Sequence, residues 1–169
     1  MWQWLLRPPR SFREGAALFA LALVGCLGWS IFVSNVLSPA LAAPAKGHFD
    51  PTSLGWAMIP LVTFSVFIEE LLRLGPLAIV VRIAGRSETA VLAAAAITAA
   101  LFGAAHVSNG LPLGFVLICQ GVVGFVMNLL FLKVGGLHRR MVRGFLFSFA
   151  FHLTFDMVIL LPALLLRQL

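Results

Sequence analysis

Long apolar stretches, separated by short polar or basic links, dominate the hydropathy pattern of the chain. A bilayer core about 30 Å thick needs roughly 20 apolar residues of helix to cross it. Stretches of about that length predict five membrane-spanning helices, at residues 16–37, 54–81, 90–106, 111–132 and 144–166. The pattern therefore predicts an all-α fold, a polytopic transmembrane helix bundle.

The second stretch, residues 54–81, is longer than one straight crossing needs. It contains Pro60 and a Gly75-Pro76 pair, and proline inside a helix removes a backbone hydrogen bond. A long apolar segment also tilts or bends to fit the bilayer. We expect this helix to be tilted, kinked or broken into a spanning helix and a short second piece.

The composition supports a membrane protein and excludes other classes. Of 169 residues, 61% are hydrophobic and 11% are charged, whereas soluble domains average about 45–50% and about 25%. Disordered chains are poor in apolar residues, and both cysteines, Cys26 and Cys119, lie within apolar stretches, which excludes a disulfide scaffold. The net charge of +6 does not indicate nucleic-acid binding, because the basic residues lie between apolar segments.

Basic residues in alternate links predict the orientation, because cytoplasmic loops are rich in lysine and arginine. One side of the membrane receives nine of them: Arg7, Arg10, Arg13, Arg82, Arg86, Lys133, Arg139, Arg140 and Arg143. The other side receives only Lys46 and Arg167. We therefore predict a protein of the cell (inner) membrane with a cytoplasmic N-terminus and an outer C-terminus. Trp2, Trp4 and Trp56 fit interfacial anchors.

Two short motifs resemble processing signals. Residues 23–26, Leu-Val-Gly-Cys, resemble a lipoprotein signal, and residues 41–43, Leu-Ala-Ala, resemble a signal-peptidase site. The apolar stretch before the second motif has 22 residues, whereas the apolar region of a signal peptide has about 7 to 15. We therefore expect the first helix to be retained.

Six ionisable residues lie within the predicted spans: Glu69, Glu70, Arg73, His106, His152 and Asp156. A charged side chain at mid-bilayer costs at least about 2.5 to 3.5 kcal/mol, so such residues usually mark a functional site. The alternative is structural, because Glu69 with Arg73, and His152 with Asp156, are one helical turn apart and can pair. Groups from three separate spans favour the functional site.

These residue types suit hydrolysis by an activated water. Glu69 and Glu70 point about 100° apart on a helix, so one can face the bundle interior while the other pairs with Arg73. A glutamate and a nearby histidine can share the water that they activate. We expect Asp156 to fix the tautomer of His152 and leave its other nitrogen to donate to an oxyanion.

Motifs of other intramembrane proteases are missing from the sequence. It contains no His-Glu-x-x-His, no Gly-x-Ser-Gly and no Gly-x-Gly-Asp with a second membrane aspartate, since Asp50 lies in a loop. We expect no metal and no cofactor, although two histidines and several carboxylates are residue types that also bind zinc.

Three motifs in order resemble the CAAX protease and bacteriocin-processing family of membrane-embedded glutamic proteases, over about residues 54–166. Residues 69–75 resemble its paired-glutamate motif, residues 102–106 match its Phe-x-x-x-His, and residues 152–156 match its His-x-x-x-Asn/Asp. We expect one transmembrane domain over residues 1–169, because the sequence shows no internal repeat and no sign of a second domain. It consists of an N-terminal helix with an outer loop, residues 16–43, and a catalytic core, residues 54–166.

The resemblance also implies roles. Glu69 is the expected base, His106 helps to activate the water, and His152 with Asp156 stabilises the oxyanion, while Arg73 and Phe102 support them. Two residues separate Glu70 from Arg73, where the family usually has three, so either glutamate remains a candidate for the base. Asp156 stands where asparagine is common, and an ionised carboxylate cannot donate a hydrogen bond, so Asp156 is expected either to orient His152 or to stay protonated.

The implied substrate is a membrane-anchored or lipidated protein in the lipid bilayer, not a nucleic acid. A prenylated tail and a bacterial C-terminal sorting signal both fit. His106 falls near the outer end of its predicted span, which favours a chamber that faces outward. The competing interpretation is a non-catalytic membrane protein, such as an immunity factor or a small transporter subunit, in which the same charges hold helices together.

Overall fold

Every regular element in the described part of the chain is helical, which confirms the predicted all-α class. The structure is a computed structural model that describes residues 1–38, 40–41, 55–84 and 87–166. The elements are α1 (Trp2–Leu5), α2 (Phe12–Phe32) with the π-helical turn η1 (Val33–Leu37), α3 (Met58–Ala84), α4 (Glu88–Ala105) with the 3-10 turn η3 (His106–Asn109), α5 (Leu113–Val116) with the π-helical turn η4 (Leu117–Gly121), α6 (Val122–Val134), the 3-10 turn η5 (Gly136–His138) and α7 (Met141–Leu166).

The long helices identify a multi-pass membrane protein. Four stretches are long and apolar enough to cross a bilayer: Phe12–Leu37, Glu88–Asn109, Leu113–His138 and Met141–Pro162. The fifth long helix, α3, has 27 residues and carries Glu69, Glu70 and Arg73 near its centre and Arg82 in its last turn. It continues through Pro76, so the chain does not form the separate short piece that the sequence allowed.

Some predictions concern residues outside the described ranges. These are the outer basic residues Lys46 and Arg167, the inner Arg86, the loop residue Asp50, the start of the second span at Leu54, and residues 42–43 of the cleavage-site motif.

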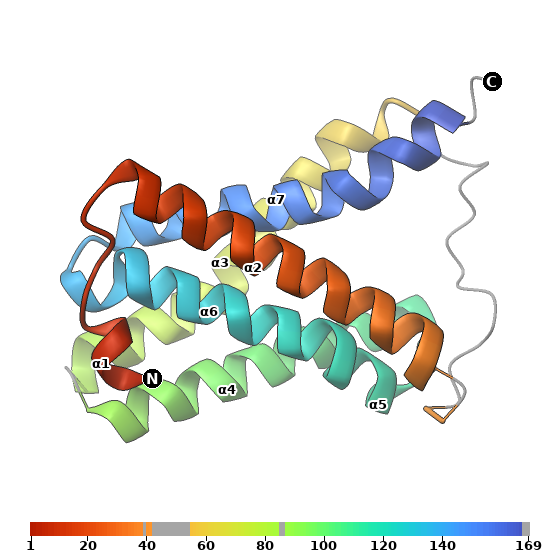
Figure 1. Cartoon of the computed structure of the whole chain (residues 1–169). Coiled ribbons are helices and arrows are strands. Elements are labelled where there is room, and N and C mark those ends of the chain that lie inside the picture. Colours follow the sequence, from red (N-terminus) through yellow and green to blue (C-terminus); the bar gives the residue numbers. More distant parts are fainter. Residues whose placement is uncertain (39, 42–54, 85–86, 167–169) are drawn as a thin grey trace.

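Four helices form the bundle that carries the ionisable groups. α4 packs against α3 and α6, and α7 packs against α3 and α6, while α2 lies across α6 and α7 (Figure 1). Toward one end, α7 and the first half of α3 diverge together from α4 and α6 (Figure 1). There, Leu160 and Leu164 of α7 pack on Met58 and Ile59 of α3. The divergence lies at the end predicted to face outside.

Close backbone contact holds α4 against the turn before α6. A Cβ atom on Gly103 would lie 2.9 Å from the Cα atom of Gly121, closer than real Cβ contacts. Only glycine therefore allows α4 and η4 to approach this closely. The contact places His106, three residues after Gly103, beside the helices that carry the other polar groups.

Two π-helical turns lie next to each other, near the end of the bundle at which α3 and α7 diverge from α4 and α6 (Figure 1). η1 ends the first long helix, and η4 precedes α6. The indole Nε1 of Trp29, in the last turn of α2 before η1, donates a hydrogen bond to the carbonyl of Ile118 in η4 at 2.8 Å, which joins the first long helix to η4. π-helical turns widen a helix and are frequent at functional sites.

The short helix α1 is fastened to the opposite end of the bundle. Leu5 is fully buried, and the Lys133 ammonium donates to the carbonyls of Trp4 and Arg7. The same ammonium lies 4.2 Å from the centre of the Trp4 ring. A buried lysine thus caps the end of α1 with hydrogen bonds and a cation–π contact.

Candidate active site

The six ionisable residues of the predicted spans gather where α3, α4 and α7 meet. Glu69, Glu70 and Arg73 lie on α3, His106 follows the last residue of α4, and His152 and Asp156 lie one turn apart on α7. Ion pairs and shared cavities connect them. The helix packing therefore brings together residues that the sequence places up to 87 positions apart, from Glu69 to Asp156.

The two adjacent glutamates have different surroundings. Glu70 is fully buried, and its Oε1 accepts hydrogen bonds from Arg73 and from Nδ1 of His152, the latter at 2.9 Å. The side chain of Glu69 is 34% exposed, and its Oε1 accepts from the hydroxyl of Ser65 at 2.9 Å. Glu70 is thus a buried structural partner, whereas Glu69 keeps a carboxylate oxygen open to the cavity.

A buried polar network surrounds Arg73 and connects α3 to α6 and α7. Besides Glu70, the guanidinium donates to the carbonyl of Gly124 at 3.1 Å, to the side chain of Asn128, and to the hydroxyl of Ser148 at 3.1 Å. A buried charge is costly unless it is paired and hydrogen-bonded. These contacts give hydrogen-bond partners to both terminal nitrogens of the guanidinium. They also fix the turn of α3 that carries both glutamates.

Asn128 extends the network to α4. Its Nδ2 donates to the carbonyl of Ala95 at 2.8 Å and to the hydroxyl of Thr98 at 2.9 Å. Asn128 and Ser148 are both fully buried. The sequence analysis considered only ionisable groups and missed these residues. The sequence did contain a signal for both residues, because uncharged polar side chains inside apolar spans also need buried partners.

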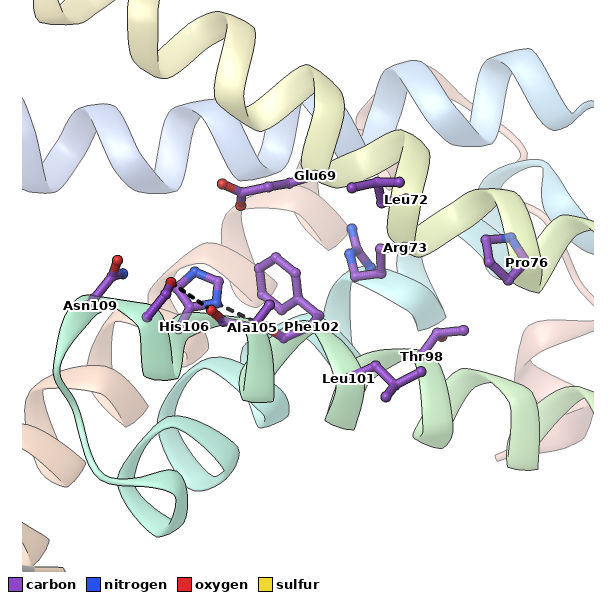
Figure 2. A pocket seen from close by; sticks show the side chains of 11 residues that line it. Glu69, Leu72, Arg73, Pro76, Thr98, Leu101, Phe102, Ala105, His106 and Asn109 are labelled. Atoms are coloured by element: carbon purple, nitrogen blue, oxygen red, sulfur yellow. Dashed lines mark hydrogen bonds between the residues drawn. The ribbon is translucent and has the colours of Figure 1, made fainter.

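A cavity of about 300 Å³ lies between α3 and α4, and we call it the Glu69 cavity. Figure 2 shows Glu69 on the α3 wall and His106 on the opposite α4 wall, with Phe102 beside them. The other lining residues are Leu72, Arg73, Pro76, Thr98, Leu101, Ala105, Ser108 and Asn109. The cavity therefore holds a carboxylate and an imidazole on facing helices, with mostly apolar walls elsewhere.

The backbone fixes the tautomer of His106. Its Nδ1 lies 2.9 Å from the carbonyl oxygen of Phe102, as drawn in Figure 2. A carbonyl only accepts, so Nδ1 carries the proton, and Nε2 of the neutral ring is an acceptor. His106 belongs to the 3-10 turn that ends α4. The tighter turn places His106 on the wall of the cavity, beyond the last α-helical turn.

Glu70, and not Asp156, bonds to Nδ1 of His152. A carboxylate accepts, so the Nδ1–H of His152 donates to Glu70 at 2.9 Å. Nε2 points toward two other carboxylates, Oε2 of Glu69 and Oδ2 of Asp156, each at 3.7 Å. The expectation that Asp156 fixes the tautomer is therefore corrected. Glu70 comes from a neighbouring helix and bonds to the ring directly, whereas Asp156 lies near the other nitrogen.

Phe102 lies between the two histidines. Its ring makes edge contacts with the rings of His106 and His152, with centroids 4.8 and 5.6 Å apart, and the Arg73 guanidinium lies 5.5 Å from its centre. A Cβ atom on Gly124 would lie 2.7 Å from the Phe102 ring. The missing side chain at Gly124 thus leaves the room in which Phe102 packs against both histidines.

A second cavity of about 220 Å³ lies on the other side of Phe102 and His106, and we call it the Asp156 cavity. Its walls come from α2, the two π-helical turns, α5, α6 and α7, together with Phe102 of α4 and His106 of η3. Its remaining lining residues are Ser30, Ser34, Phe115, Cys119, Gln120, Val123, Met127, His152, Phe155, Asp156 and Ile159. Phe102 and His106 line both cavities. The helix before the catalytic core thus contributes to the site, which the sequence analysis did not anticipate.

The described residues contain no group of three or more histidine, cysteine, aspartate or glutamate side chains arranged to hold a metal ion. The expectation of a metal-independent site remains a prediction.

Comparison with known proteins identifies the family. The family model described as type II CAAX prenyl endopeptidase Rce1-like matches residues 51–158, more than half of the chain. The matched region includes every candidate site residue on α3, α4 and α7. No curated protein and no solved structure matches the chain.

Proposed function

The chain belongs to the Rce1-like family of type II CAAX prenyl endopeptidases, and we therefore propose that it is an intramembrane glutamic endopeptidase. The family is a protease family, so the protein is a membrane-spanning peptidase with a protein substrate. In the proposed reaction, a water activated by glutamate and histidine hydrolyses a peptide bond near a membrane-anchored C-terminal tail. The observation that carries this proposal is the shared cavity of Glu69 and His106.

Glu69 is the proposed base. Its partly exposed carboxylate faces the Glu69 cavity, whereas Glu70 is fully buried and is already bonded to Arg73 and His152. A water between Glu69 and His106 meets two acceptors, the carboxylate and the unprotonated Nε2. Together they hold both protons of the water and leave an oxygen lone pair for the substrate carbonyl.

In the proposed reaction, water adds to the substrate carbonyl before the peptide bond breaks. The water oxygen bonds to the carbonyl carbon, its proton moves to Glu69, and the carbonyl oxygen becomes an oxyanion. The oxyanion then re-forms the carbonyl double bond as the carbon–nitrogen bond breaks, and Glu69 gives its proton to the leaving nitrogen. The products are a carboxylic acid and an amine. Hydrogen-bond donors aimed at the oxyanion lower the barrier to this step.

His152 is the proposed oxyanion donor. Its Nδ1–H is committed to Glu70, so only Nε2 can donate, and it does so when the ring carries both protons. Glu69 and Asp156 lie 3.7 Å from that nitrogen and, with Glu70, balance the positive charge of the ring. Asp156 has the proposed role of a counter-charge, because an ionised carboxylate has no proton to donate.

A substrate that enters from the bilayer is supported by the position of the Glu69 cavity. Its rim residues Leu72 and Leu101 are 73% and 65% exposed on the outer surfaces of α3 and α4. Large exposed apolar side chains on a membrane protein face lipid. A lipidated or transmembrane tail can therefore reach the cavity between α3 and α4 without crossing water.

An outward-facing chamber is supported by the turn after α4. Ser108 and Asn109 line the Glu69 cavity, and they belong to the uncharged link opposite the basic links. With a cytoplasmic N-terminus, this link lies outside. The proposed enzyme therefore removes or shortens tails on the outer side of the cell membrane.

The test is a comparison of membrane-protein C-termini in cells that make the wild-type protein, Glu69→Gln or the matched control Glu88→Gln. Glu88 is an exposed residue at the start of α4, away from both cavities. We expect a set of shortened proteins with wild type and with Glu88→Gln, and full-length forms with Glu69→Gln. Identical C-termini in all three strains would show that the proposed function is wrong.

A further inference from the structure

We propose that the Asp156 cavity is a substrate subsite that binds a basic side chain, lysine or arginine, next to the cleaved bond. This inference rests on the proposed function and names a feature of its substrate. Phe102 and His106 form a common wall of the two cavities, so a side chain in the Asp156 cavity belongs to a peptide that lies beside the water-activating pair.

Unused hydrogen-bond acceptors line the Asp156 cavity. The buried Oε1 atom of Gln120 has no hydrogen-bond partner among the described residues. The Asp156 carboxylate forms no hydrogen bond within the described part of the chain; its ion pair with Nε2 of His152 spans 3.7 Å, and its side chain is 32% exposed. A buried polar atom without a partner is costly, so a ligand that donates hydrogen bonds is favoured here.

The remaining walls are apolar, including Val123, Met127 and Phe155. A volume of about 220 Å³ is several times the roughly 30 Å³ that one water occupies. Lysine and arginine combine a long apolar stem with a charged donor group at its end. The stem fits against the apolar walls, while the charged end pairs with the partly exposed Asp156 carboxylate.

Charge balance also favours a cationic occupant. The site contains three carboxylates, Glu69, Glu70 and Asp156, and Arg73 balances one of them through its pair with Glu70. In the proposed reaction His152 carries one positive charge, which leaves one negative charge unbalanced. An uncompensated charge inside a membrane protein is expensive, so a positive group from the substrate stabilises the complex.

The experiment uses one substrate identified by the C-terminal comparison. Each of the three positions on either side of its cleaved bond is changed in turn to lysine, methionine or glutamate, and cleavage rates are measured with purified wild-type protein in liposomes. Methionine matches the apolar length of lysine without its charge. At one position we expect the substrate with lysine to be cleaved about tenfold faster than the substrate with methionine. The substrate with glutamate should be cleaved more slowly than either.

The test variant of the enzyme is Ser34→Lys, and its matched control is Asn35→Lys. Ser34 lines the Asp156 cavity, whereas the neighbouring Asn35 does not and donates to the carbonyl of Ile31 on its own helix. A lysine at position 34 places a competing charge at the cavity. We expect Ser34→Lys to abolish the preference for lysine and to speed cleavage of the glutamate reporter, while Asn35→Lys keeps the wild-type order.

The outcomes separate this inference from the proposed function. Cleavage that depends on Glu69 but is equally fast with lysine, methionine and glutamate at every position would overturn the subsite and leave the protease proposal standing. A preference for methionine, or equal slowing of all reporters by Ser34→Lys, would also overturn it, because the cavity would then bind an apolar side chain or the peptide backbone. If wild type and Glu69→Gln give identical C-termini, both proposals fail.

Discussion

Nδ1 of His152 donates a hydrogen bond to Oε1 of Glu70, at 2.9 Å, across the interface between α7 and α3. The same oxygen accepts from Arg73, which lies one turn along α3. One buried carboxylate therefore orients the histidine and balances the arginine. Its neighbour Glu69 lies about 100° around the helix and faces the cavity instead. This arrangement gives two adjacent glutamates separate tasks.

Glu69→Gln is expected to abolish turnover and leave folding intact. The amide keeps the shape of the side chain and can still accept from Ser65, but it is no longer a base. The measurement is cleavage of an identified substrate by purified protein, together with its thermal unfolding. Near-normal turnover by Glu69→Gln would show that another residue is the base.

Glu70→Gln is expected to reduce stability by about 3 kcal/mol, because it leaves the buried Arg73 guanidinium without its counter-charge. Turnover per folded molecule should fall less than with Glu69→Gln. Thermal unfolding in detergent and single-turnover rates on the folded fraction measure the two effects separately. A well-folded, inactive Glu70→Gln beside an active Glu69→Gln would assign the base to Glu70. Full activity of both variants would exclude a glutamic protease.

Gly124→Ala is expected to lower activity, because the added methyl group meets the Phe102 ring at 2.7 Å and pushes it toward the histidines. Overpacking of this kind usually costs about 1 to 3 kcal/mol. The control is Gly28→Ala, where an added Cβ has no heavy-atom neighbour within 4 Å. Turnover and unfolding temperature are measured for both. Equal behaviour of the two variants would show that the packing of Phe102 does not position the histidines.

Activity is expected without a bound metal, because Glu69 and His106 suffice to activate a water. Elemental analysis of purified active protein and assays with a chelator check this expectation. One zinc per chain, with activity that is lost on chelation and restored by zinc, would replace the proposed mechanism with a metal-dependent one.

Lys133→Met is expected to reduce stability by about 1.5 to 3 kcal/mol without changing the cleavage chemistry. The ammonium donates to two carbonyls at the end of α1, and hydrogen bonds from charged groups contribute about that much. The control is Arg143→Met, an exposed position on α7. Unfolding temperature and turnover of the folded protein distinguish the two. A loss of turnover in fully folded Lys133→Met would indicate that α1 influences the site.

The hydropathy pattern alone predicted the all-α class and most long helices, because the bilayer fixes how many apolar residues a crossing helix needs. The same pattern isolated the six ionisable residues, since charge inside an apolar span is conspicuous. It did not predict Asn128 and Ser148 as partners of Arg73, because only charged groups were considered, although uncharged polar side chains in such spans also need buried partners.

The roles of the two glutamates depend on the tertiary structure. In sequence they are neighbours with the same side chain, and helical geometry states only that they point about 100° apart. Which one is buried depends on how α3 is rotated against α6 and α7, and the contacts of Arg73 with Gly124 and Ser148 hold that rotation. The partner of His152 likewise comes from another helix rather than from Asp156 one turn away, because hydrogen bonds follow distance in space and not spacing along the chain.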